Sequence, residues 1–375
     1  MHHGKLGMTE DFHSLKKFWK NKKVFLTGDT GFKGSWMSIF LNLLGAKVTG
    51  YSLRPNNKLN LFDLAKVHKI NEKSIVGDIR NYKKLKKSII KFKPDFIIHM
   101  AAQSLVRYSY IYPKYTYEVN TIGTLNILNI INEINFVKSA LIITTDKVYE
   151  NKDKKLYYKE NDRLNGFDPY SNSKACAELI CDSYNNSFFK KKKIFVATAR
   201  AGNVIGGGDF SLNRVLPDYF RSFKKGKILL RSPNSIRPWQ HVIDPLYGYL
   251  ILLYNLHKKK ITSRQWNFGP SKNNNKSVYE IISMINSEFN NKIKVIKKPI
   301  LSKLYHESRV LMLNSSKAKH LLNWKAKSDI KLSLKLTADW YKKFLNNDNV
   351  LKICQQQILN YFKIKKTNNY LHGYK

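Results

Sequence analysis

The sequence is short of acidic residues, cysteine and long apolar runs, and each shortage excludes a class of protein. Only 26 Asp and Glu residues stand against 67 Lys and Arg residues in a chain of 375. The three cysteines, Cys176, Cys181 and Cys354, show no C-x-x-C spacing, so they predict neither a disulfide framework nor a metal site. They fit reduced thiols and a cytoplasmic location. The longest apolar run, about Pro245 to Leu256, is too short to cross a membrane, so it predicts a buried helix and no membrane partner.

The excess of basic residues gives a formal net charge of +41 at pH 7, which is the most unusual property of the composition. Nucleic-acid-binding proteins concentrate basic residues on one face or in one tail. Here lysine is scattered along the chain, with short runs at Lys190–Lys193 and Lys258–Lys260. We therefore expect no specific nucleic-acid binding, and a basic nucleic-acid-binding protein is the alternative of a different class. An acidic substrate would benefit from the positive field.

Short apolar runs alternate with longer amphipathic stretches over roughly the first 200 residues. Strands are predicted at Val24–Thr27, Lys47–Tyr51, Ile75–Val76, Phe96–His99, Leu141–Thr144 and Ile194–Ala199. Helices are predicted between them, at about Gly34–Leu44, Asn81–Phe92 and Tyr117–Ile134. This alternation predicts an α/β fold with a Rossmann-type, doubly wound parallel sheet. Beyond about Ala201 the pattern is irregular and predicts a smaller C-terminal α/β lobe that binds the substrate.

A glycine-rich turn follows the first predicted strand and opens the first predicted helix. It has the spacing G-x-x-G-x-x-G over residues 28–34. Glycines allow a tight turn and the close approach of a pyrophosphate, which the helix N-terminus stabilises with its N–H groups and dipole. At this place in the pattern, a dinucleotide-binding turn is a better interpretation than an ordinary glycine turn. The predicted contacts are Gly28, Thr30, Gly31, Phe32, Lys33 and Gly34.

The alternation of strands and helices, which ends at about Ala201, also predicts how the chain divides into two domains. We expect residues 18–200 to form the dinucleotide-binding domain, with residues 238–262 returning to it. Residues 201–237 and 263–375 are expected to form the substrate-binding lobe.

The position that selects between NAD and NADP does not follow the usual rule. An acidic residue is expected about 20 residues after the glycines, where it holds the adenosine ribose of NAD. No Asp or Glu lies between Asp29 and Asp63, and Arg54 stands near the expected place, as in sites for NADP. We predict NAD, and the sequence leaves NADP open. Asp78 and Ile79, after the third predicted strand, are predicted contacts of the adenine ring.

Two groups of polar residues could perform chemistry. Tyr170 and Lys174 are four residues apart and would share one face of a helix. A phenol has a pKa near 10, and a nearby ammonium together with the positively charged nicotinamide lowers that pKa, so Tyr170 could take a proton from a substrate hydroxyl. Thr145, Asp146 and Lys147 follow a predicted strand, at the sheet edge where ligands bind in such folds. They offer a hydroxyl, an acid and an amine in sequence.

Together these motifs resemble the extended short-chain dehydrogenase/reductase superfamily and, within it, the nucleotide-sugar 4,6-dehydratases, above all those of the CDP-glucose branch. The resemblance covers about residues 18–324. Its most specific segments are Thr27–Trp36, His99–Arg107, Thr145–Asn151, Arg200–Asp209 and Arg237–Val242. Relatives that act on dTDP-glucose typically carry glutamate where Lys147 stands. Two residues depart from the pattern. Asp29 stands where the family usually has histidine, which would place a negative charge near the pyrophosphate, and Asn314 stands where aspartate is usual.

The resemblance implies a reaction in three steps: oxidation at C4 of a hexose, elimination of water across C5 and C6, and return of the hydride to C6. Tyr170 would deprotonate the C4 hydroxyl, with Thr145 bonded to the same oxygen and Lys174 holding the nicotinamide ribose. Lys147 would be the base at C5, and Asp146 would be the acid that protonates the departing C6 hydroxyl. Another nucleotide-sugar 4,6-dehydratase, for example one for UDP-N-acetylglucosamine, or an epimerase is the alternative within the superfamily.

The resemblance also implies further ligand contacts. Cofactor contacts are expected from Ala101, Ala102, Gln103 and Asn120, besides Tyr170 and Lys174. Substrate contacts are expected from Gln103, Asn203, Arg214, Arg237 and Arg309, because guanidinium groups bind phosphates with paired hydrogen bonds. A homodimer formed through helices beside the sheet is expected from the superfamily.

Overall fold

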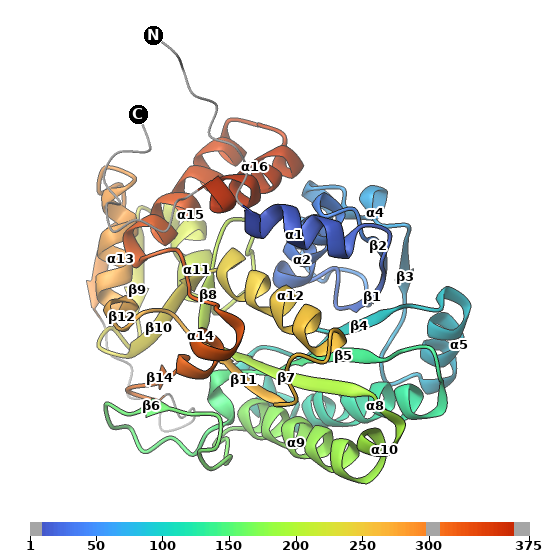
Figure 1. Ribbon diagram of the computed structural model, residues 1–375. Coiled ribbons are helices and arrows are strands. Elements are labelled where there is room, and N and C mark those ends of the chain that lie inside the picture. The colour runs from blue at the N-terminus through green and yellow to red at the C-terminus, as the bar shows by residue number, and fades with distance from the viewer. Residues whose placement is uncertain (1–9, 298–307, 364–375) are drawn as a thin grey trace.

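The computed structural model describes residues 10–297 and 308–363. Its centre is a seven-stranded, wholly parallel sheet with the order β11-β7-β5-β4-β1-β2-β3 (Figure 1). The strands are β1 (Lys23–Thr27), β2 (Lys47–Ser52), β3 (Lys73–Val76), β4 (Phe96–His99), β5 (Ser139–Ile143), β7 (Phe195–Ala201) and β11 (Gln265–Phe268). The chain winds outward from β1 in both directions, so the predicted doubly wound sheet is confirmed.

Helices cover both faces of this sheet, as Figure 1 shows. One face carries α1 (Glu10–Trp19), α2 (Phe32–Leu43), α12 (Ile243–His257) and α16 (Val350–Lys363). The other face carries α5 (Tyr82–Phe92), α8 (Gly123–Glu133) and α9 (Pro169–Tyr184). Successive side chains of a strand point to opposite faces, so Val24 and Leu26 join the first core while Phe25 joins the second.

Short elements connect these units. They are α3 (Leu61–Leu64), α4 (Val67–Ile70), α6 (Val106–Ile111), α7 (Pro113–Tyr117), the π-helical turns η1 (Glu118–Ile122) and η3 (Asn185–Phe189), the 3-10 turn η2 (Asp146–Val148) and α10 (Lys190–Lys192). The turn η2 follows β5 at the carboxyl edge of the sheet, where ligands bind in such folds.

A smaller lobe is built from short strands and helices around its own core. Its strands are β6 (Tyr157–Tyr158), β8 (Asn203–Ile205), β9 (Lys227–Leu230), β10 (Ile236–His241), β12 (Asn275–Ser277), β13 (Lys294–Lys297) and β14 (Met312–Leu313). Its helices are α11 (Val215–Arg221), η4 (Ser222–Lys225), η5 (Lys272–Asn274), α13 (Val278–Ser287), α14 (Ser316–Leu322) and α15 (Ile330–Leu345). Trp239 and Trp324 are both buried.

The division of the chain into a dinucleotide-binding domain and a lobe stays a proposal, and we propose a later start for the last segment of the lobe. β11 pairs in parallel with β7, and its Trp266 and Phe268 are fully buried in the first core. We therefore place the boundary after Phe268 instead of before residue 263. Residues 298–307 and 364–375 of the predicted lobe lie outside the described residues.

The helix α16 returns to the beginning of the described chain. The ring of Phe362 lies 5.1 Å from that of Phe12 and 5.2 Å from that of Tyr247. Lys327 adds a cation–π contact with Tyr361, 4.9 Å from the ring centroid, and an ion pair with Asp11. Segments from both ends of the described chain therefore close the same face of the sheet.

The predicted buried helix is α12, whose Leu250, Leu252 and Leu253 have no exposed surface. Within residues 10–297 and 308–363, no helix combines the length and the apolar character that a bilayer crossing requires.

Candidate active site

The glycine turn has the geometry that a pyrophosphate site needs. Gly28 has a φ of +81°, and a Cβ there would lie 2.7 Å from the backbone nitrogen of Ala101. A Cβ on Gly34 would lie 1.9 Å from the carbonyl oxygen of Gly28. Gly31 differs, because a Cβ there would meet only that same oxygen, at 3.4 Å. Packing within the protein therefore does not require glycine at 31, but its missing side chain leaves the N-terminus of α2 open to a ligand.

This turn lines a cavity of about 400 Å³ that the loops after β1, β2, β3 and β4 share with the lobe. The cavity brings together twelve predicted cofactor residues: Gly28, Thr30, Gly31, Phe32, Lys33, Gly34, Arg54, Asp78, Ile79, Ala101, Ala102 and Gln103. The lobe contributes residues 208–211 and Arg214. Sequence reasoning missed Ser52, Leu53, Tyr115 and Val119, and the position of Ser52 at the end of β2 was the available signal.

Asp78 and Ile79 lie where the third strand ends. Burial opposes ionisation of Asp78, but hydrogen bonds from Arg80 outweigh it and hold the pKa of Asp78 below its usual range. Arg80 donates from Nη2 to Asp78 at 2.7 Å and from Nη1 to Glu118 at 2.9 Å. The carbonyl oxygen of Ile79 accepts a hydrogen bond from Asn126 at 2.9 Å. Asp78 therefore presents a carboxylate that is already paired.

Gln103 and Asn120 hold the loop after β4. The Asn120 side chain accepts from the backbone N–H of Gln103 at 2.8 Å and donates to its carbonyl oxygen at 2.9 Å. It also donates to Ser173 on α9 at 2.9 Å. The side-chain amide of Gln103 donates to Thr116 at 3.0 Å. These two predicted ligand contacts thus shape the cavity wall through bonds within the protein.

Thr145 and Asp146 lie at the carboxyl end of β5, in and just before η2. Thr145 Oγ1 donates to Asp146 Oδ1 at 3.1 Å and accepts from the backbone N–H of Lys147 at 3.3 Å. Asp146 is 2% exposed, and its Oδ2 has no hydrogen-bond partner among the described residues. Burial raises the pKa of Asp146, although the charge of Lys147 and the bond from Thr145 oppose the rise. A carboxyl group with a raised pKa is suited to donate a proton.

Tyr170 and Lys174 stand one turn apart on α9, where Asp168 caps the helix by accepting from Ser171 N at 3.0 Å. Lys174 Nζ donates to the carbonyl oxygen of Ile143 at 2.7 Å, which ties the helix to the end of β5. Burial lowers the pKa of Lys174 to about 8, while Glu178 opposes this change.

Burial is the largest effect on Tyr170 in the protein alone and raises its pKa to about 12. The predicted lowering by an ammonium together with a bound nicotinamide stays a prediction. A hydrogen bond with Thr145 and the charge of Arg214 act in the lowering direction, while Asp146 raises the pKa further. Thr145, Asp146 and Arg214 therefore all act on the phenol of Tyr170.

Lys33 joins these groups through its side chain, whereas sequence reasoning assigned it only to the glycine turn. Burial lowers the pKa of Lys33 to about 8, and the charges of Arg214 and Lys174 lower it further. Asp146 opposes them. The first turn of α2 thus carries an amine on which the charges of Asp146, Lys174 and Arg214 all act.

A buried ion pair behind the site was not predicted. Glu178, one turn after Lys174, accepts from Arg200 Nε and Nη2, both at 2.9 Å, and each side chain is 1% exposed. Thr144 Oγ1 donates to Glu178 at 2.5 Å, and Arg200 Nη1 donates to Tyr149 Oη at 2.8 Å. The segment that carries Thr145, Asp146 and Lys147 is therefore held at both of its ends by one ion pair.

Three of the four predicted substrate contacts in the lobe lie on adjoining segments, because β8, which carries Asn203, pairs with β10, and Arg237 on β10 donates from Nη1 to the carbonyl oxygen of Arg309 at 3.4 Å. Of these four, only Arg214 lines the cavity, where it pairs with Asp209 at 3.3 Å and donates to Ser104 at 3.2 Å. Arg237 is buried and donates to the carbonyl oxygen of Ile236 at 2.9 Å, and its charge acts on Asp146. Two more complete the set: Arg309, which is exposed, and Asn203, which lies in β8. In the described part of the chain, no three His, Cys, Asp or Glu side chains gather to hold a metal ion.

Known proteins are similar to this chain over most of its length. The family described as GDP-mannose 4,6 dehydratase matches residues 25–337. The CDP-glucose 4,6-dehydratase of Salmonella typhimurium is 39% identical over 353 residues, which are 92% of this chain and 98% of the relative. The dTDP-D-glucose 4,6-dehydratase of Mus musculus is 27% identical, over 87% of this chain and 90% of the relative.

Solved structures share the fold. The UDP-glucose 4-epimerase of Thermotoga maritima, solved with UDP-glucose, has a TM-score of 0.75 at 20% identity and covers 86% of this chain and 99% of its own. The dTDP-glucose 4,6-dehydratase of Bacillus anthracis, solved in complex with NAD, has a TM-score of 0.73 at 22% identity and covers 88% and 99%. With the matched family and the extent of the first relative, these findings show that the chain belongs to the GDP-mannose 4,6 dehydratase family of nucleotide-sugar dehydratases, within the extended short-chain dehydrogenase/reductase superfamily.

Proposed function

We propose that this enzyme, a lyase, removes water from CDP-D-glucose and forms CDP-4-dehydro-6-deoxy-D-glucose. The similarity to the CDP-glucose 4,6-dehydratase of Salmonella typhimurium supports the substrate. The observation that carries the reaction is that Thr145 is hydrogen-bonded both to Asp146, at 3.1 Å, and to Tyr170, so that one hydroxyl links the acid to the phenol. Lys147, the next residue, adds an amine whose charge acts on Asp146.

The cofactor is proposed to be NAD, held by the glycine turn and by Lys174. When bound, it supplies an acceptor for the hydride of C4 and later returns that hydride to C6. The turn supports this proposal through the open N-terminus of α2 and the two glycines at 28 and 34 that leave no room for a side chain.

Tyr170 is proposed to take the proton of the C4 hydroxyl. In the protein alone its pKa is about 12, so the phenol must become more acidic in the complex. Thr145 and Arg214 already act in that direction. A positive charge added close to the phenol would act in the same direction.

Asp146 is proposed to protonate the departing C6 hydroxyl, and Lys147 to take the C5 proton. The pKa of Asp146, which burial raises, supports the role of acid, because a general acid works best when its pKa is shifted toward the working pH. Its unpartnered Oδ2 leaves one oxygen for the substrate. Arg214, at the cavity wall, is proposed to bind the diphosphate together with Arg237, Arg309 and Asn203, while Gln103 borders the sugar.

The proposal is tested by incubating the purified protein with CDP-, dTDP-, UDP- and GDP-hexoses and measuring product masses. We expect the loss of one water from CDP-glucose, and much slower turnover of the others. An unchanged mass with an altered sugar configuration would show an epimerase instead. Loss of water from another nucleotide sugar in preference to CDP-glucose would move the substrate to that class.

The roles of Asp146 and Lys147 need a separate test. Asp146→Asn and Lys147→Ala should still oxidise C4 but should eliminate water at least about 100-fold more slowly, which is the usual contribution of one acid or base. Stopped-flow absorbance of the reduced nicotinamide would show accumulation in both variants. If Lys147→Ala eliminates water at the normal rate, its role as base is wrong.

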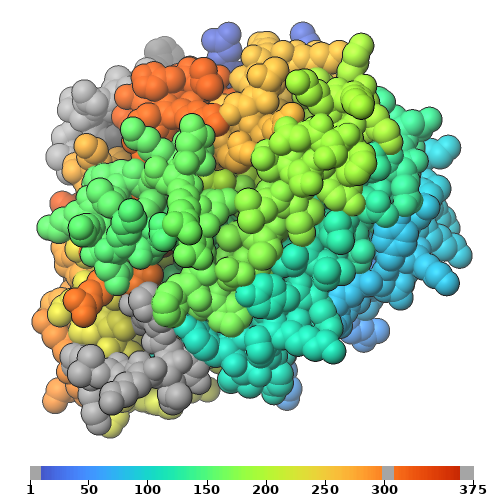
Figure 2. Space-filling model, turned by 90° about the horizontal axis from the view of Figure 1, so that it is seen from below, coloured from blue at the N-terminus to red at the C-terminus, as the bar shows by residue number. Residues whose placement is uncertain are grey.

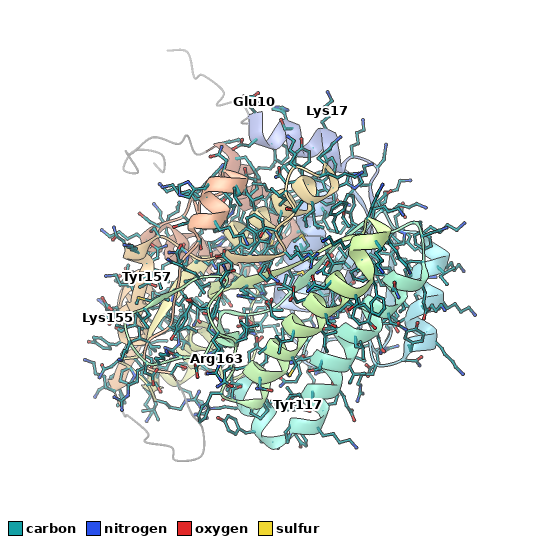
Figure 3. The ribbon with its side chains drawn as sticks, turned by 60° about the horizontal axis from the view of Figure 1, so that its bottom comes forward. Glu10, Lys17, Tyr117, Lys155, Tyr157 and Arg163 are labelled. Carbon is teal, nitrogen blue, oxygen red and sulfur yellow. The ribbon has the colours of Figure 1, made fainter. Side chains whose placement is uncertain are left out.

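The enzyme is also proposed to act as a homodimer through the helical face that carries α8 and α9, which lie side by side in Figure 2. Ile122, Leu179 and Phe188 expose apolar surface on this layer. Tyr117, labelled in Figure 3, donates to Asn172 at 2.9 Å and joins α7 to α9 within it. Light scattering of the wild type and of Leu179→Glu tests the proposal, because a charge at this interface should yield monomers. The free thiols fit a reducing cytoplasm, where we propose that the reaction takes place.

A further inference from the structure

The departure at Asp29 does not place a charge against the pyrophosphate turn. The carboxylate turns away from it and is 1% exposed. Ser52 Oγ donates to Oδ1 at 2.5 Å, and Ser74 Oγ donates to Oδ2 at 3.1 Å. Asn71 Nδ2 approaches the same oxygen at 3.4 Å. Gly50 leaves the space that the carboxylate fills, because a Cβ there would lie 1.8 Å from Oδ2. Strands β2 and β3 thus form a pocket that holds one carboxylate, with hydrogen-bond donors from Ser52 and Ser74 and space over Gly50.

Ser52 stands between this carboxylate and the cavity. It is the last residue of β2 and it lines the cavity wall, beside the glycine turn. The end of the second strand is where dinucleotide-binding folds place the group that holds the adenosine ribose. The hydroxyl of Ser52 donates its proton to Asp29 and accepts from the backbone N–H of Thr30 at 3.5 Å, which leaves one lone pair of its oxygen for a donor on the cavity side.

We propose that Ser52, backed by Asp29, recognises the adenosine ribose of NAD and disfavours the 2′-phosphate of NADP. This inference rests on the proposed function, since it concerns the cofactor of that reaction. A ribose hydroxyl can donate to the Ser52 oxygen, whereas a 2′-phosphate has no proton to donate when fully ionised. The negative charge of Asp29 lies one hydrogen bond behind that oxygen and repels the phosphate.

Arg54 opposes this selection, because its positive charge favours NADP. It lines the same cavity and would attract a 2′-phosphate. Its side chain is exposed, so water and salt screen its charge. The Asp29 carboxylate is buried, and buried charges are screened much less. Burial also raises the pKa of Asp29 while its hydrogen bonds oppose the rise, so the selection should weaken in acid, where the carboxylate gains a proton.

Calorimetric titration of the cofactor-free protein with NAD+ and with NADP+ tests the inference. We expect the wild type to bind NAD+ at least about tenfold more tightly, which corresponds to 1.4 kcal/mol. Asp29→Asn removes the charge and should reduce this ratio by about three- to tenfold, mainly through tighter binding of NADP+. Ser52→Ala should weaken NAD+ binding by about fivefold, because a hydrogen bond contributes roughly 1 kcal/mol.

Two control variants separate recognition from folding. Ser74→Ala removes another donor to the same carboxylate, but Ser74 does not line the cavity, so the ratio should stay within about twofold of the wild type. Arg54→Ala should weaken NADP+ binding alone. Equal or tighter binding of NADP+ by the wild type would overturn the inference, as would an unchanged ratio in both Asp29→Asn and Ser52→Ala. Failure of the proposed function would show differently, as NAD+ binding without loss of water from CDP-glucose.

Discussion

At the scale of single residues, the absence of a side chain matters as much as its presence. Gly28 and Gly226 both have positive φ, at +81° and +62°. A Cβ on Gly28 would collide with the backbone of Ala101, whereas a Cβ on Gly226 would meet no atom within 4 Å. A substitution at Gly226 would therefore strain only the backbone, whereas a substitution at Gly28 would strain the backbone and also collide with its neighbours.

Gly28→Ala should lower the free energy of unfolding by more than about 2 kcal/mol, because the backbone strain and the collision add. Gly226→Ala should cost about 1 kcal/mol from the backbone alone. Urea denaturation of both variants measures the difference, and titration with NAD+ should show lost binding only for Gly28→Ala. Equal costs in the two variants would mean that the turn relaxes around the added methyl group.

Lys174 makes a prediction about pH. Its pKa is about 8 in the folded protein, against 10.5 in the reference state, so the unfolded chain binds more protons between these values. Stability must then rise with pH across this window, by up to about 3 kcal/mol from this residue. Urea denaturation from pH 7.5 to 10.5 checks this by comparing the wild type with Lys174→Met. The difference in free energy of unfolding between the wild type and Lys174→Met should change with pH. A difference that stays constant would contradict the lowered pKa of Lys174.

At the scale of elements, the ion pair of Glu178 and Arg200 connects the helix α9 to the turn η2. Thr144 and Tyr149 bond to opposite partners of the pair, so α9, β7 and the 144–149 segment share one anchor. The precise placement of Asp146 relative to Tyr170 thus depends on residues that cannot touch the substrate. We regard both members of the pair as positioning residues.

Glu178→Gln leaves Arg200 buried without a charge partner and should lower the free energy of unfolding by about 3–5 kcal/mol. Elimination should slow more than cofactor binding weakens, because η2 loses its anchor while the glycine turn does not. The control is Asp182→Asn. Asp182 lies on the same helix as Glu178 and forms a partly exposed ion pair with Arg264, so this variant should lower the free energy of unfolding by less than about 1 kcal/mol. Loss of stability with elimination unchanged would reduce the pair to a structural role.

Sequence patterns predicted the elements better than the directions of their side chains. The strands from Val24 to Ala199 were found because each buries a short apolar run, and the glycine turn because its spacing is dictated by backbone geometry. The direction of Asp29 was not predictable, since it depends on Ser52, Ser74 and the space over Gly50. Glu178 was missed because an acidic residue on a helix usually faces water.

At the scale of the whole molecule, the charge of +41 sets the response to salt. Self-repulsion of so many like charges destabilises the compact state, and salt screens it. Raising NaCl from about 20 mM to about 200 mM shortens the screening length from roughly 20 Å to roughly 7 Å, so we expect the melting temperature to rise by several degrees. Choline chloride at the same concentrations should raise the melting temperature by the same amount as NaCl, which scanning calorimetry would measure. A fall in melting temperature would show that ion pairs outweigh the repulsion.

The closure of one sheet face by α1 and α16 also constrains how the protein is made. Phe12 and Phe362 are in contact, yet a ribosome adding about 5–20 residues per second needs roughly 20–70 s to pass from one to the other. During that interval, the nascent chain has α2, and later also α12, without the aromatic surface that finally shields them. The first half of the protein is therefore translated before its core can be completed, and chaperones that bind exposed apolar segments would have their main opportunity in this interval.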